Sequence, residues 1–232
     1  MREHIENLIP EHQSNSIRSF KPKVDVFPDL TVLFIDVVGL TNLFFNLQPH
    51  EADKQAAELL SRLFSKFDEV TVENKVQKIQ IIGTRYIVMG YNGKVDIPKR
   101  DPVLEANRIM GCAFEMLRAV NEVNMKYFQA SPMQQHKPMK ALDPRSFKRG
   151  SSSESISNSL TEKMRVDVTI GVHSGPAIGG IIGSKIMHYE ILGEAVYIAN
   201  KMEANGQPFR VCISGETKKL LSREEESDYE FQ

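Results

Sequence analysis

The first residue that could do chemistry is Asp36, which lies near the end of a run of apolar and β-branched residues beginning at Leu30. Such a run is typical of a buried strand. Gly39 then permits a turn with positive φ, and Thr41 can cap a helix behind it. A carboxylate beside a turn and a helix N-terminus suits a metal ion and a phosphate, because the acid binds the cation while backbone N–H groups face the anion. For an isolated Asp, the commoner alternative is a turn residue that accepts backbone hydrogen bonds.

Helices and strands on either side would position this carboxylate. Apolar residues recur at three- and four-residue spacing over 56–70 and over 101–127, which is typical of helices with one buried face. Two short strands are predicted at 76–83 and 85–91, joined by a tight turn that begins at Gly83. These elements predict a sheet covered by two long helices.

The last third of the chain completes the predicted order. The elements expected there are a strand over 165–174, a break at Gly175-Pro176, a partner strand over 177–182, a helix over 193–206, a strand over 209–213 and a short helix capped by Ser214. The whole chain therefore predicts an α+β fold, a ferredoxin-like βαββαβ sandwich with additional elements. That fold hosts many functions, so it does not by itself indicate one.

The domain organisation follows from changes in composition. Residues 1–29 predict an N-terminal linker, in which Pro22 and Pro28 favour extended backbone, and residues 30–231 predict one domain. Within that domain, 129–163 is rich in Ser, Pro, Gln and Lys and has little apolar periodicity. We expect this stretch to be a disordered insertion.

Charge and cysteine content exclude several classes of protein. The formal net charge of -1 gives no indication of the basic face that a nucleic acid would require, so no nucleic-acid partner is expected. Cys112 and Cys212 fall in predicted buried elements, which favours reduced thiols.

No apolar run reaches membrane-spanning length, so the segment itself is expected to make no membrane contact. We expect a cytoplasmic location, either as a free protein or as the cytosolic portion of a membrane protein.

Four stretches together resemble the class III nucleotide cyclase catalytic domain, the adenylyl and guanylyl cyclase family. They are VLFIDVVGLT (32–41), KIQIIG (78–83), IGVHSGP (170–176, with glycines following at 179–183) and LGEAVYIANKM (192–202), in the family's order and spacing. The resemblance implies that the ribose 3′-hydroxyl of ATP or GTP attacks the α-phosphate, giving the 3′,5′-cyclic nucleotide and pyrophosphate. It also implies two Mg²⁺ or Mn²⁺ ions held by two Asp residues, and an Asn and an Arg contributed by a second cyclase domain.

Some family positions are matched in this chain. By resemblance, Asp36 stands at the first metal-binding Asp, and Arg210 stands at an Arg that contacts phosphates. The residues whose backbone matches the phosphate-facing turn are Val37, Val38, Gly39, Leu40 and Thr41.

Other family positions carry a different residue. Thr84 stands at the second metal-binding Asp, and its neutral hydroxyl cannot replace a bridging carboxylate. Tyr197 stands at the orienting Asn, and Lys201 stands at the Arg without the bidentate fork of a guanidinium. Gln80 and Glu190 stand at the purine-selecting positions, where adenylyl members usually have Lys and Asp and guanylyl members have Glu and Cys. The base preference therefore stays open.

Two functions remain. The chain could be the metal-bearing half of a cyclase, a phosphorus-oxygen lyase whose site is completed by a second domain in a heterodimer or an intramolecular pair. It would then be nearly inactive alone, since losing one transition-state electrostatic group costs ~10²–10³ in rate. The alternative is a catalytically degenerate pseudo-cyclase that serves as a regulatory or dimerisation domain in cyclic nucleotide signalling. A ferredoxin-like RNA binder is disfavoured, because the basic-aromatic strand signature is absent.

Overall fold

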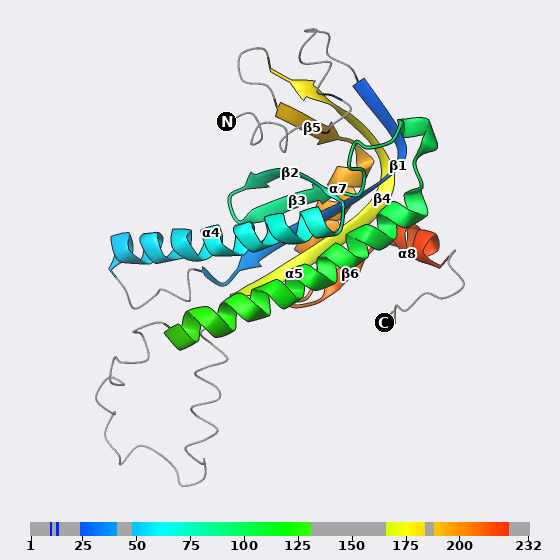
Figure 1. Ribbon diagram of the computed structural model, residues 1–232. Coiled ribbons are helices and arrows are strands. Elements are labelled where there is room, and N and C mark those ends of the chain that lie inside the picture. Colours follow the sequence, from blue (N-terminus) through cyan, green and yellow to red (C-terminus); the bar gives the residue numbers. More distant parts are fainter. Residues whose placement is uncertain are drawn as a thin grey trace, which may run out of the picture.

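The computed structural model describes Pro10, Gln13 and residues 24–40, 48–130, 166–183 and 188–222. Six strands form one sheet in the order β2-β3-β1-β4-β5, and β6 pairs with β4. The strands are β1 (Val24–Val38), β2 (Gln77–Ile82), β3 (Arg85–Met89), β4 (Asp167–Ile182), β5 (His188–Leu192) and β6 (Val211–Ile213). All pairs are antiparallel except β4 with β6. Figure 1 shows β1 and β4 as the two long curved strands at the centre.

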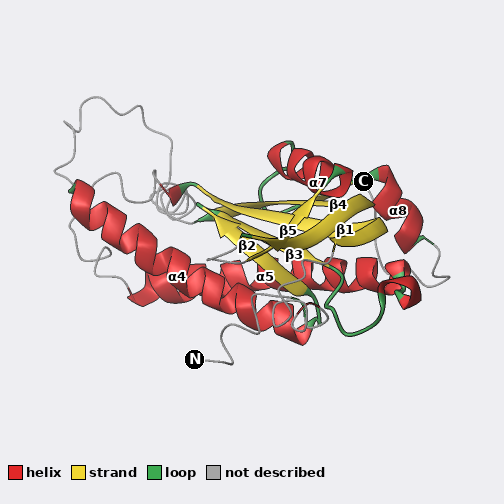
Figure 2. Cartoon of the chain, turned by 90° about the horizontal axis from the view of Figure 1, so that it is seen from above, coloured by secondary structure: helices red, strands yellow, loops and turns green. Residues whose placement is uncertain are grey.

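Helices cover both faces of this sheet (Figure 2). They are α4 (Pro49–Glu73), α5 (Pro102–Ala130), α7 (Glu194–Ala204) and α8 (Gly215–Leu221), and a short 3₁₀ helix, η2, spans Ile97–Lys99. The long helices α4 and α5 lie side by side on one face, and α7 lies on the other. No helix among the described residues is long and apolar enough to cross a membrane.

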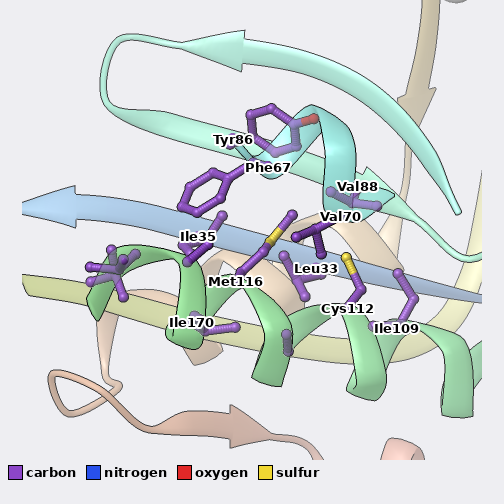
Figure 3. Close-up of a cluster of buried hydrophobic side chains, with 14 of the residues drawn as sticks. Leu33, Ile35, Phe67, Val70, Tyr86, Val88, Ile109, Cys112, Met116 and Ile170 are labelled. Carbon is purple, nitrogen blue, oxygen red and sulfur yellow. The ribbon is translucent and has the colours of Figure 1, made fainter. Parts of the chain in front are cut away.

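Strand alternation divides the core into two layers. In β1, Leu33 and Ile35 point towards α4 and α5, where they join the larger cluster with Phe67 and Met116 (Figure 3). The intervening Phe34 belongs to the second cluster, on the side of α7. Because residues 30–35 of β1 are buried on both faces, this part of the strand reads in the sequence as a nearly continuous apolar run rather than an alternating one.

The predicted α+β fold is confirmed. The first six elements follow the order strand, helix, strand, strand, helix, strand, and the first four strands lie in the order β4-β1-β3-β2, which is the ferredoxin-like arrangement. The additional elements β5, α7, β6 and α8 extend the far side of β4 and both helical layers.

The two central strands are longer than predicted. β1 begins at Val24 rather than Leu30, and β4 runs unbroken through Gly175-Pro176, where a break was predicted. The cause is a bulge in β1 between Phe27 and Leu30, which lies opposite Pro176. A proline lacks a backbone N–H, so it is tolerated where a bulge already interrupts the ladder of hydrogen bonds.

Three further boundaries differ from the sequence-based expectation. The sequence did not predict β5, which pairs with the second half of β4. Helix α5 continues to Ala130, so the first residues of the expected 129–163 insertion are helical, and the rest of it lies outside the described residues. Most of the expected 1–29 linker also lies outside them, but residues 24–29 belong to the sheet.

Candidate functional site

Asp36 lies near the end of β1, where three strands meet. Its neighbours in the sheet register are Arg85 on β3 and Thr169 on β4. Its side chain alternates with the α4-facing Ile35 and Val37, and therefore points to the face covered by α7. The same alternation brings the neighbouring side chains on β3 and β4 to this face, so they can contact Asp36.

Both carboxylate oxygens of Asp36 accept hydrogen bonds from the β2–β3 hairpin. Thr84 donates its hydroxyl to Oδ1 at 2.6 Å, and Arg85 donates Nε–H to Oδ2 at 3.2 Å. The Val37 N–H also donates to the Thr84 carbonyl at 3.1 Å. Gly83 has a φ of 64°, which lets the chain turn tightly enough to place both side chains there. The Asp36 side chain is only 15% exposed, so these protein groups replace most of its water.

The Arg85 guanidinium also reaches α7. Its Nε lies 3.5 Å from Oε2 of Glu203, whose side chain is 4% exposed. Thr169 donates its hydroxyl to the other oxygen of Glu203 at 2.5 Å. The four side chains Asp36, Arg85, Thr169 and Glu203 therefore link β1, β3, β4 and α7.

The sequence analysis missed Arg85 and Glu203. Glu203 lies one helical turn beyond Ala199 on the inner face of α7, where both residues are buried. A charged residue on a buried helix face needs a partner of opposite charge, and this was the signal that could have revealed the pair.

The two-metal site implied by the family does not fit these residues. Mg²⁺ and Mn²⁺ are held by several oxygen ligands, usually one or two carboxylates together with waters and substrate phosphates. In the described part of the chain, no group of three His, Cys, Asp or Glu residues could hold a metal ion. Asp36 stands beside a neutral Thr84 and a positively charged Arg85, and both of its oxygens are engaged. A guanidinium in this position repels a divalent cation.

The turn after β1 is described only in part. Gly39 has a φ of 86°, the left-handed conformation that its glycine permits. The Val37 N–H donates its hydrogen bond to the Thr84 carbonyl, and Leu40 packs against the larger core cluster. Thr41 lies outside the described residues.

The two positions expected to orient a substrate lie on the outer side of α7. Tyr197 is 63% exposed, and the Lys201 ammonium lies 5.6 Å from the centre of its ring, one helical turn away. This is a cation–π contact between the two side chains. They present an aromatic ring and an ammonium to solvent, whereas the family positions carry an amide and a guanidinium.

The two positions expected to select the purine, Gln80 and Glu190, are in direct contact. Gln80 on β2 donates its side-chain N–H to Oε1 of Glu190 on β5 at 2.9 Å. His188 places Nε2 3.5 Å from the other oxygen of Glu190. Purine edges carry both donors and acceptors. An amide beside a carboxylate therefore offers groups that can pair with either base.

Arg210 lies across β4 from Asp36. Thr169 is the register partner of Asp36, and the next residue, Ile170, pairs with Val211 of β6. Two strand spacings therefore separate the backbones of Asp36 and Arg210, about 10 Å. The Arg210 residue is exposed, and its backbone N–H donates to the Gln207 carbonyl at 3.1 Å.

Comparison with known proteins agrees with this fold. The model of the family "Adenylate and Guanylate cyclase catalytic domain" matches residues 23–232. The chain is 24% identical over 218 residues to "Guanylyl cyclase, membrane" of Dictyostelium discoideum, covering 94% of the chain and 12% of that protein. It is 27% identical over 215 residues to "Guanylate cyclase soluble subunit beta-2" of Rattus norvegicus, covering 92% of the chain and 25% of that protein.

A solved structure shows the same fold. The guanylate cyclase domain of RhGC from Catenaria anguillulae, in complex with GTP, superposes with a TM-score of 0.57 at 19% identity, covering 85% of this chain and 84% of that one. The chain spans a quarter or less of the length of the two curated relatives above. Because the family model matches nearly the whole chain, the chain belongs to the adenylate and guanylate cyclase catalytic domain family.

Proposed function

We propose that this chain is the catalytically degenerate half of a two-domain cyclase assembly, a regulatory or dimerisation domain in cyclic nucleotide signalling. The observation that carries the proposal is the state of Asp36, whose carboxylate is engaged by the Thr84 hydroxyl and the Arg85 guanidinium. A carboxylate held in this way cannot also supply the charge that two metal ions need.

The surface of α7 supports the same proposal. Tyr197 offers one phenolic hydroxyl at the end of an aromatic ring, in place of the carbonyl and NH₂ groups of an amide. The Lys201 ammonium lies over that ring. Loss of a single electrostatic group at a transition state costs ~10²–10³ in rate, so the combined changes predict almost no turnover by this chain.

The Gln80–Glu190 pair supports retained binding of a purine nucleotide, ATP or GTP. The Glu190 side chain is 18% exposed, so it can exchange its partners for a ligand. The assembly we propose pairs this domain with a second cyclase domain, either on another chain or elsewhere in a longer one. The name of the rat relative, a soluble subunit, is consistent with such pairing.

One observation favours a second candidate. Asp36 is retained, with Arg210 across a single strand, and these are the two features expected of the metal-bearing half of a heterodimeric cyclase. In that case the partner domain would have to displace Arg85 from Asp36 when the two domains assemble.

The isosteric change Asp36→Asn separates the two candidates. The chain is co-expressed with a catalytically competent cyclase domain, and cyclic AMP and cyclic GMP are measured. A degenerate domain predicts output within about twofold of wild type, whereas a metal-bearing half predicts a loss of ~10² or more. Asp53→Asn, at an exposed acid on α4, is the matched control, and thermal unfolding checks that each variant is folded.

A further inference from the structure

We propose that Arg85 is a built-in cation that takes the place of a divalent metal at Asp36 and fastens α7 to the sheet through Glu203. The inference rests on the proposed function, since a working metal site would require this arginine to leave. It goes further, because it gives the Asp36 centre a structural role of its own and states how metal binding could be restored.

The geometry is that of one cation shared by two acids. The Nε atom of Arg85 lies 3.2 Å from Asp36 Oδ2 and 3.5 Å from Glu203 Oε2. The two acids come from different elements, β1 and α7. A metal ion bridging two carboxylates would connect the same pair of elements, so the guanidinium supplies an equivalent link with a single charge.

Burial makes this cation necessary. The side chains of Asp36 and Glu203 are 15% and 4% exposed, so two negative charges lie close together with little water. Removing the partner from a buried charge is strongly destabilising, because the remaining charge is left uncompensated. Arg85 is 42% exposed, which lets its positive charge keep some hydration while it neutralises the acids.

Two threonines complete the centre. Thr84 donates its hydroxyl to Asp36, and Thr169 donates its hydroxyl to Glu203. Each acid therefore accepts a hydrogen bond from one threonine hydroxyl. The Arg85 guanidinium donates a hydrogen bond to Asp36 and forms a longer ion pair with Glu203, whose Oε2 accepts no hydrogen bond from the described residues. A third carboxylate at position 84 would instead raise the negative charge to a level that suits a divalent ion. Thr84 and Arg85 therefore act in the same direction. Thr84 supplies no negative charge for a metal ion, and Arg85 supplies a positive charge that repels one.

The test measures binding of Mn²⁺ alone, from the paramagnetic resonance signal of the free ion. Wild type is compared with Thr84→Asp/Arg85→Ala, which adds a third carboxylate to the centre and removes the cation. We expect the double variant to bind Mn²⁺ at least tenfold more tightly than wild type, and we expect Asp36→Asn in that background to abolish the gain. Equal affinity in wild type and the double variant, lost in both on Asp36→Asn, would overturn the proposal.

Thr84→Asp alone provides a second arm that holds even if the double variant does not fold. Because this variant keeps Arg85, we expect its Mn²⁺ affinity to stay within twofold of wild type. A tenfold gain in this single variant would show that the guanidinium does not compete with a metal, and the proposal would fail.

The fastening role has its own readout. Arg85→Met is expected to lower Tm by about 5 °C, since two buried acids lose their cation. Arg118→Met, at an exposed arginine on α5, should leave Tm unchanged. An unchanged Tm in Arg85→Met would refute the role of Arg85 in holding α7. These measurements use the chain alone, so failure here is distinguishable from failure of the regulatory function, which is read from cyclic nucleotide output with a partner domain.

Discussion

Gln80 and Glu190 are separated by 110 residues, and their side chains meet at 2.9 Å. They lie on β2 and β5, the first and last strands in the sheet order β2-β3-β1-β4-β5. Strands at opposite ends of a flat sheet would be far apart. The sheet therefore curves until its two edges approach each other, and the two positions expected to select the purine lie where they meet.

The first prediction concerns this pair. Glu190→Gln should weaken binding of ATP or GTP about tenfold, because an acceptor with full negative charge becomes a neutral amide. The measurement is the rise in Tm at a fixed nucleotide concentration, since a ligand that binds the folded state stabilises it. Glu58→Gln, an exposed acid on α4, is the control and should retain the full rise. An unchanged rise in Glu190→Gln would place the nucleotide elsewhere.

The fold was predictable from sequence because its signals are local. The apolar run before Asp36 and the three- and four-residue spacing of α4 and α5 are periodic patterns that report burial directly. The continuous β4 was not predictable in this way. Gly175-Pro176 is a strong local signal for a break, and only the bulge in the partner strand β1 makes the proline acceptable.

A residue of the candidate site could be predicted only where it stands at a functional position of the family that the sequence resembles. The Thr84 hydroxyl donates a hydrogen bond to the Asp36 carboxylate, as the position of Thr84 in the β2–β3 hairpin implied. Arg85 was overlooked because its role depends on an ion pair with Glu203, which lies on α7 far along the chain. No sequence pattern relates the two positions. The contact of Gln80 with Glu190 is of the same kind, since it depends on the curvature of the whole sheet.

The second prediction concerns a buried ion pair. The Arg100 Nε donates to Glu105 at 3.0 Å, and the guanidinium lies 5.1 Å from the centre of the Phe27 ring. Burial raises the pKa of Glu105 even though Arg100 opposes the rise. Arg100→Met should lower the free energy of unfolding by about 3–5 kcal/mol, because Glu105 is left buried without its partner.

Urea denaturation measures this loss. Lys99→Met is the control, since its side chain is 76% exposed and pairs only with the exposed Asp96 in the described residues. Such surface pairs contribute at most about 1 kcal/mol. A loss below that value in Arg100→Met would mean that Glu105 is neutral in the folded protein and does not need the guanidinium.

The third prediction concerns pH. His173 is 1% exposed, and its Nδ1 lies 2.7 Å from the hydroxyl of Ser214, which caps α8. Burial lowers the pKa of His173 in the folded state, and the nearby Glu216 only partly opposes this. As pH falls below about 6.5, the unfolded chain takes up the proton first. The free energy of unfolding should therefore fall from that pH until the lower folded-state pKa is reached.

The comparison of two histidines isolates this effect. Urea midpoints are measured at pH 7 and pH 5.5 for His173→Gln and for His188→Gln, whose side chain is 55% exposed. We expect His173→Gln to lose part of the acid sensitivity, whereas His188→Gln should keep it. If both variants retain the wild-type difference between the two pH values, His173 is protonated as easily in the folded protein as in the unfolded chain.

The fourth prediction concerns a close approach of α7 to the sheet at Gly171. A Cβ at Gly171 would lie 1.9 Å from the backbone nitrogen of Glu203 and 2.5 Å from the carbonyl oxygen of Ala199. These are backbone atoms of a helix, so no side chain can move aside to make room. Gly171→Ala should therefore lower the free energy of unfolding by at least the ~1–3 kcal/mol typical of overpacking.

Gly215→Ala is the matched control, because a Cβ there meets nothing within 4 Å. Gly215 begins α8, where alanine should stabilise the protein by ~0.4–1 kcal/mol through the reduced freedom of the unfolded chain. Urea denaturation should thus move the two variants in opposite directions. A Gly171→Ala protein as stable as wild type would show that α7 can lift away from β4 at little cost.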